Sequence, residues 1–205
     1  MAASNDPKTL ASFINCLSRL ENNTYLLYKD LADKVEAPLV RSFLLQIAID
    51  SQKHSIALKG VAESIAKPSD NIQECEKKIG ETWRIVEILL KEVKGKKKIP
   101  SGDFPKLVEK LTVLESVMGE EYYMFVQLKT LEVMMKEINR IYNIDLASVK
   151  KIFLNIIRDE ETHRELLEKT KKLVTPETEL DTAPVVKYQN PDAWSRPLPD
   201  TTYTA

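Results

Sequence analysis

The sequence predicts an all-α protein: an antiparallel four-helix bundle with an inserted helix between its second and third helices and an extended C-terminal tail. The chain of 205 residues contains only 5 glycines. Between Pro38 and Pro176 the only prolines are Pro68, Pro100 and Pro105. Strands need turn residues more often than this. Apolar residues instead recur every three or four positions over long segments, which is the period of an amphipathic helix.

The composition fits one ordinary domain followed by a tail, with 43% hydrophobic and 30% charged residues and a net charge of -1. Because 30 basic residues face 31 acidic ones, the chain lacks the basic excess typical of binding to nucleic acid or to anionic membranes. No segment approaches the roughly 20 apolar residues of a membrane span. We therefore expect a cytoplasmic protein with neither nucleic acid nor membrane as a partner.

The first two helices are predicted to form a hairpin. Asp6 and Pro7 make a good helix start, and apolar residues then recur with helical spacing from Leu10 to Leu31. After a short turn at 35–38 the same period returns and continues to about Ile65. A link this short makes the two helices antiparallel.

The inserted helix is expected at about 70–94, after a break and a new N-cap at 67–70. The lysine-rich stretch that follows is interpreted as a solvated linker. The third bundle helix begins near Asp103, the chain reverses between 136 and 145, and the fourth helix starts at about Leu146.

The composition changes at Thr175, because the residues from there to the end contain five of the ten prolines and show no helical period. We therefore divide the chain into a helical bundle over 1–174 and a proline-rich tail over 175–205. The tail keeps apolar residues such as Val185 and Trp194. This content favours an extended segment that packs on the bundle or on a partner subunit over plain disorder.

Polar residues interrupt the apolar stripe of each predicted bundle helix near its middle. These candidate metal ligands are Glu21, Asp50, His54, Glu121, Glu160 and His163. A buried carboxylate without a partner costs several kcal/mol, so several of them at one level of a bundle require a shared cation. Two divalent metal ions would satisfy them together.

The two histidines occupy equivalent places in a helical repeat. Val40 to His54 and Val149 to His163 are each 14 residues. Glu160 lies three positions before His163, so both side chains are on one helix face and can bind the same ion. The chain has 2 cysteines, which provide no disulfide framework and no cysteine-based metal site. We expect Cys16 to be a small buried residue.

With these motifs the chain resembles the ferritin-like superfamily, and within it the rubrerythrin or erythrin branch, over about 1–173. The matching residues are Glu21 with Tyr28, His54, Glu121 in Gly-Glu-Glu-Tyr-Tyr, and Glu160-Glu-Thr-His163. The resemblance implies two metal ions, iron in first place with manganese or zinc as alternatives, and a reaction with dioxygen or hydrogen peroxide. It also implies a homo-oligomer and, since a rubredoxin domain is missing, a separate electron-donor protein.

Three alternatives stay open at this stage. Ser51 stands where the family has a glutamate, so Asp50 or water takes that place or only one metal binds firmly. On the third helix, Glu132 and Glu120 are alternatives to Glu121 as the metal ligand. Counting residues from the start of the helix favours Glu121. In function, a helical scaffold or binding protein with a degenerate metal site competes with an oxidase or peroxidase, and ferroxidase activity with iron sequestration is a further alternative.

Overall fold

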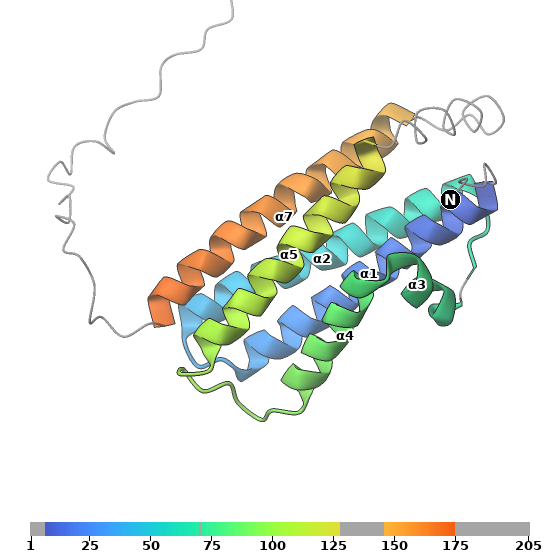
Figure 1. Cartoon of the computed structure of the whole chain (residues 1–205). Helices are drawn as coiled ribbons and strands as arrows, with labels where there is room; N and C mark the ends of the chain where they lie inside the picture. Colours follow the sequence, from blue (N-terminus) through green and yellow to red (C-terminus); the bar gives the residue numbers. More distant parts are fainter. Residues whose placement is uncertain (1–6, 70, 128–145, 175–205) are drawn as a thin grey trace, which may run out of the picture. The chain divides into compact units, whose positions relative to one another are not determined.

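The structure, a computed structural model, describes residues 7–69, 71–127 and 146–174 (Figure 1). All regular secondary structure in these ranges is α-helical, which confirms the predicted all-α class. The helices are α1 (Pro7–Lys34), α2 (Pro38–Ile65), α3 (Ile72–Ile79), α4 (Glu81–Lys94), α5 (Phe104–Gln127) and α7 (Leu146–Val174). None of the helices in the described ranges combines the length and the apolar character that crossing a membrane requires.

The four long helices pack in pairs. Helix α1 packs along α2, α5 packs along α7, and α2 also contacts α7. Helices α1 and α2 run in opposite directions, as the short link predicts, and so do α5 and α7 (Figure 1). Helices α2 and α5 run in the same direction, because α3 and α4 return the chain to the end where α2 began (Figure 1). This long crossover allows residues from all four helices to meet at one level.

The inserted segment is two helices, so the prediction of one continuous helix over 70–94 is wrong. Gly80 separates α3 from α4 and has φ +69°, a backbone conformation that glycine adopts without steric cost. Asn71 caps α3, since its side chain accepts a hydrogen bond of 3.0 Å from the Gln73 amide. Helix α4 buries Trp83 and Val86 and packs on α1 of the same chain.

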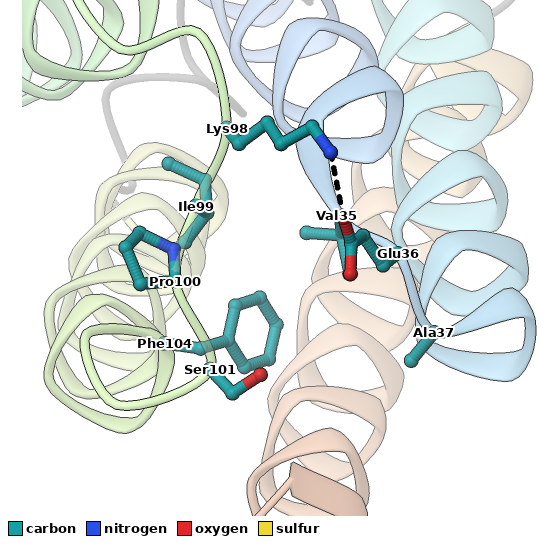
Figure 2. A pocket seen from close by; sticks show the side chains of 8 residues that line it. All are labelled: Val35, Glu36, Ala37, Lys98, Ile99, Pro100, Ser101 and Phe104. Atoms are coloured by element: carbon teal, nitrogen blue, oxygen red, sulfur yellow. Dashed lines mark hydrogen bonds and ion pairs between the residues drawn. The ribbon is translucent and has the colours of Figure 1, made fainter.

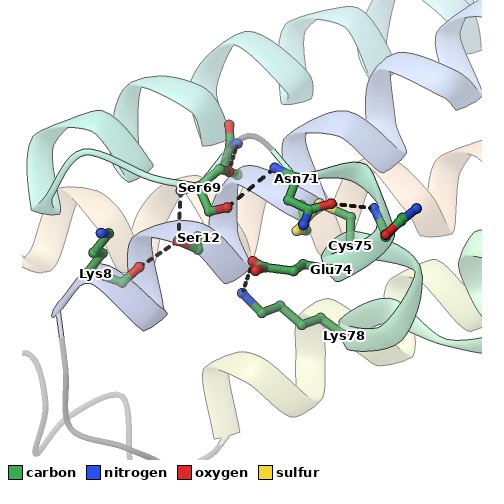
Figure 3. Close-up of a disulfide and its surroundings, with 10 residues drawn as sticks. Lys8, Ser12, Ser69, Asn71, Glu74, Cys75 and Lys78 are labelled. Atoms are coloured by element: carbon green, nitrogen blue, oxygen red, sulfur yellow. Dashed lines mark hydrogen bonds and ion pairs between the residues drawn. A yellow bond between two sulfur atoms is a disulfide. The ribbon is translucent and has the colours of Figure 1, made fainter.

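A disulfide bond between Cys16 and Cys75 joins α1 to α3 (Figure 3). Cys16 is buried, as expected, but its pairing with Cys75 was not predicted. Polar contacts fasten the same region, because the Ser69 amide donates to Ser12 Oγ at 2.9 Å and Asn15 Nδ2 donates to the Ser69 carbonyl at 3.1 Å. The segment that follows α2 therefore lies beside the first half of α1. The disulfide attaches α3 covalently to α1 there.

The lysine-rich linker after α4 is fastened to the α1–α2 turn. The Ile99 amide donates to the Lys34 carbonyl at 3.1 Å, and Lys98 forms an ion pair of 2.8 Å with Glu36 (Figure 2). Glu36, Lys98 and Ile99 line a pocket of about 270 Å³ together with Phe104 at the start of α5. None of the predicted metal ligands lines this pocket. We interpret it as a packing feature of the linker.

Three predictions concern parts of the chain outside the described residues. One is the proline-rich tail over 175–205 with its proposed packing. The others are the reversal of the chain between 136 and 145 and Glu132, the alternative ligand of the third helix. All three stay predictions.

Candidate metal centre

Five buried ionisable side chains from four helices meet in the interior. They are Glu21 of α1, His54 of α2, Glu115 of α5, and Glu160 and His163 of α7, each at most 2% exposed. Their ligand atoms form two triads, Glu21–His54–Glu160 and Glu115–Glu160–His163, and within each triad these atoms lie within 4.8 Å of one another. Glu160 belongs to both triads.

Each histidine turns its Nδ1 atom toward the carboxylates. Nδ1 of His54 lies 3.6 Å from Glu21 Oε1 and 3.4 Å from Glu160 Oε1. Nδ1 of His163 lies 3.0 Å from Glu115 Oε2 and 3.8 Å from Glu160 Oε2. The two oxygens of Glu160 thus face different histidines, whose ring centroids are 6.1 Å apart. Glu160 is therefore the residue shared by the two groups that could hold a metal ion.

Two buried tyrosines hold the outer glutamates. Tyr122 of α5 donates to Glu21 Oε1 of α1 at 2.5 Å, and Tyr28 of α1 donates to Glu115 Oε1 of α5. Each tyrosine lies seven residues after the glutamate of its own helix and contacts the glutamate of the other helix. The pattern Glu-x6-Tyr therefore occurs once in each half of the site, and the two copies exchange hydrogen bonds.

Two aspartates contact the outer nitrogens of the imidazoles. Nε2 of His54 lies 3.0 Å from Asp159 Oδ2, and Nε2 of His163 lies 3.5 Å from Asp50 Oδ2. Each aspartate lies four residues before the histidine of its own helix, so the pattern Asp-x3-His also occurs twice. A proton on Nε2 that is donated to an aspartate leaves Nδ1 available for a metal ion.

Lys53 lies over both aspartates. Its Nζ atom is 2.6 Å from Asp50 Oδ1 and 3.2 Å from Asp159 Oδ2. One cation thus holds the two carboxylates that orient the imidazoles. Asp50, with 24% of its side chain exposed, lies on this outer side of His163 and belongs to neither triad.

Several buried polar atoms of the centre have no hydrogen-bond partner among the described residues. They are Glu21 Oε2, Ser51 Oγ, His54 Nδ1 and both carboxylate oxygens of Glu160. An unsatisfied buried donor or acceptor costs about 1–3 kcal/mol, and more when it is charged. Unpaired oxygens and an unpaired imidazole nitrogen are a set of ligands that divalent transition metals bind. The residues present therefore fit a metal centre.

Without metal, the histidines are the cations that balance the carboxylates. Burial by itself lowers the pKa of His54, but the charge of Glu21 and contact with Glu160 outweigh it and raise this pKa to about 10. For His163, burial again lowers the pKa, while hydrogen bonds with Asp50, Glu115 and Glu160 raise it to about 12. A metal ion must displace these protons in order to bind Nδ1.

The two glutamates of the second triad respond in opposite ways. Burial and the negative charges of Glu115 and Glu21 raise the pKa of Glu160 to about 8. Burial would also raise the pKa of Glu115, but hydrogen bonding and charge interaction with His163 lower it below the usual value. Glu160 is therefore the carboxylate that most needs additional positive charge.

Glu115, a member of the second triad, was not among the predicted ligands. Of the predicted ligands, Glu21, His54, Glu160 and His163 come together, whereas the side chain of Glu121 lies outside the described part of the structure. A signal was present, because only Glu115 among the third-helix candidates is followed seven residues later by a tyrosine, as Glu21 is.

Ser51 marks the difference between the halves. It lies three residues before His54, as Glu160 does before His163. Its side chain is buried and its Oγ has no hydrogen-bond partner within the described ranges. The α2 position equivalent to Glu160 of α7 therefore provides a neutral hydroxyl.

Comparison of the chain with models of protein families, with curated proteins and with solved structures gives no match.

Proposed function

We propose that this protein is a ferritin-like four-helix protein with a di-metal centre, iron in first place, that reacts with dioxygen or hydrogen peroxide. The observation that supports the proposal most strongly is Glu160, a buried carboxylate whose two unpartnered oxygens face two different histidines. The crossover between α2 and α5 is the connection found in ferritin-like folds.

In this proposal each half of the site holds one metal ion. Glu21 and His54 provide ligands for one ion, Glu115 and His163 for the other, and Glu160 bridges them. Three glutamates with neutral imidazoles carry three negative charges, which suits two divalent ions. When bound, such ions supply the electrons and the open coordination positions that reduction of an oxygen species requires.

The surrounding residues keep the ligands in place. Tyr28 donates to Glu115 Oε1 and Tyr122 donates to Glu21 Oε1, and each bond fixes the rotation of its carboxylate. Asp50 and Asp159 hold protons at Nε2 of the histidines and direct Nδ1 inward. Repeated turnover would draw electrons from a separate donor protein, which is part of the proposal, as is a homo-oligomeric state.

A second function is favoured by Ser51. A half-site that lacks one carboxylate binds its ion more weakly, and a scaffold with a degenerate centre would carry one ion or none. The Cys16–Cys75 disulfide bears on the cellular location, since disulfides are rare in reducing compartments. It weighs against the predicted cytoplasmic location, which stays a prediction.

Metal content of protein purified without oxygen separates the two functions. The di-metal proposal expects two ions per chain by elemental analysis, reduced in His54→Ala and in His163→Ala. Glu115→Ala should reduce the content as well, while Glu109→Ala, an exposed glutamate on the same helix, is the matched control. One ion or none, unaffected by His54→Ala, would favour the scaffold.

A further inference from the structure

A narrow cleft between α5 and α7 leads from the surface to the carboxylates of the centre. Its volume is about 190 Å³, and its inner residues are Glu115 and Glu160. We propose that divalent metal ions reach the centre through this cleft, and this inference rests on the proposed function. Glu160 lines the inner part of the cleft, and both of its carboxylate oxygens are buried without a partner among the described residues.

The mouth of the cleft is acidic. The exposed residues Glu120 and Glu161 line it, and Arg164 is the one cationic side chain in the lining. The Arg164 guanidinium is already engaged, since it donates to Glu161 and, at 3.3 Å, to Ser116 Oγ on the opposite helix. A surplus of carboxylates at a narrow opening attracts cations and raises their local concentration.

Gly119 keeps the cleft open. A Cβ atom at this position would lie 3.5 Å from Glu160 Cβ, so alanine fits in ordinary contact and a larger side chain would fill the passage. The two halves of the site differ here. Four residues after its glutamate, α5 has Gly119, whereas α1 has Tyr25, which packs against the core. Gly119 therefore leaves space beside the glutamate on the α5–α7 side, where the equivalent position of α1 has the large side chain of Tyr25.

A second cleft, between α2 and α7, is a poorer path for a cation although it is larger, about 360 Å³. Its lining contains two cations, Lys53 and Arg158, and one carboxylate, Asp159, so its net charge opposes the approach of a divalent ion even though Lys53 pairs with Asp159. It also reaches His54 at Nε2, the nitrogen paired with Asp159, and so leads to the side of the imidazole that faces away from the glutamates.

The test compares matched substitutions in the two clefts of the full-length, metal-free protein. Gly119→Leu fills the α5–α7 cleft, Gly119→Ala is its conservative control, and Ala57→Leu places the same side chain in the α2–α7 cleft. The probe is Co²⁺, followed by stopped-flow absorbance, and the bound cobalt is then measured at equilibrium. Thermal unfolding checks that each variant is folded.

We expect Gly119→Leu to slow cobalt association at least tenfold while the final cobalt content stays the same. Gly119→Ala and Ala57→Leu should remain within twofold of the unchanged protein. The double variant Glu120→Gln/Glu161→Gln removes both negative charges with side chains of nearly the same size, and it also removes the ion pair of Arg164. Its association rate should fall several-fold at low salt and approach that of the unchanged protein at about 1 M salt, where surface charges are screened.

Different failures have different meanings. A protein that takes up no cobalt overturns the proposed function along with the path. Normal uptake that is slowed by Ala57→Leu and not by Gly119→Leu overturns the path alone. The path is also wrong if Gly119→Leu lowers the final cobalt content at an unchanged rate, because that result indicates distorted ligands. If Gly119→Leu does not fold, an unchanged rate in the double glutamine variant overturns the path.

Discussion

The His54 half and the His163 half of the centre are built on the same plan and differ at one ligand position. Each half has a glutamate followed by a tyrosine seven residues later, and an aspartate followed by a histidine four residues later. Three residues before the histidine, one half has Glu160 and the other has Ser51. The tyrosines and aspartates that position the ligands are therefore duplicated, while the carboxylate between the two histidines comes from α7 alone.

Removing the shared carboxylate should have the largest effect. Glu160→Gln takes away the charge that faces both histidines, so we expect metal affinity to fall at least 100-fold in both halves, consistent with loss of a ligand from each ion. Competitive titration with a chromophoric chelator measures this affinity. Ser51→Ala, the equivalent position on α2, is the matched control and should change affinity less than threefold. Loss of only one ion in Glu160→Gln would contradict a bridging role.

Restoring the missing carboxylate should strengthen the weaker half. In Ser51→Glu, a second carboxylate comes three residues before His54, and we expect the affinity of the more weakly bound ion to rise at least tenfold. Ser51→Gln has nearly the same size without the charge and separates electrostatics from packing. If both variants bind metal equally, the hydroxyl of Ser51 is not the reason for any weakness in that half.

The paired tyrosines allow a direct comparison of the halves. Tyr122→Phe and Tyr28→Phe each remove one hydrogen bond to a buried carboxylate, a contact worth about 1.5–3 kcal/mol. We expect each variant to lose about 10-fold in metal affinity, Tyr122→Phe at the Glu21 half and Tyr28→Phe at the Glu115 half. Cobalt absorbance spectra resolved during titration identify the affected ion. Equal loss from both ions in either variant would mean that the halves do not respond separately.

Sequence alone predicts the helices and four of the five residues in the two triads, because each of these residues interrupts an apolar stripe of period 3.6. Glu115 was not predicted because it adjoins Leu114, which belongs to an unbroken apolar stripe of α5. The gap that was attributed to Glu121 is filled by Tyr122, whose buried ring is apolar although its hydroxyl binds Glu21. A polar residue that interrupts an apolar stripe indicates a ligand only where no side chain with both apolar and polar parts, such as tyrosine, occupies the next position of the stripe.

The break at Gly80 and the disulfide have other causes. The amphipathic period continues from α3 into α4, so periodicity does not locate the turn between them; it depends on the positive φ of one glycine. Cys16 and Cys75 are 59 residues apart, and their contact follows from how α3 returns over α1. Such a long-range pairing has no local signature in the sequence.

The smallest expected difference between the halves is the order in which their histidines lose a proton in the metal-free protein. The pKa of His54 is raised to about 10 and that of His163 to about 12, so His54 should lose its proton first as pH rises. Both protons are bound more tightly in the folded chain than in the unfolded one. Their contribution to the free energy of unfolding is therefore complete below pH 6.5 and is lost as pH rises toward those values.

Histidine Cε1 signals in NMR spectra, recorded from pH 7 upward, give the order of titration, with His54→Gln and His163→Gln for assignment. Denaturant unfolding over the same range should show stability falling with pH, by at most about 1.4 kcal/mol per pH unit for each retained proton. With metal bound the trend should reverse, since metal ions compete with these protons and gain affinity as pH rises. If His163 titrates before His54, the carboxylates around His163 do not hold its proton more strongly than those around His54 do. The predicted electrostatic difference between the halves is then wrong.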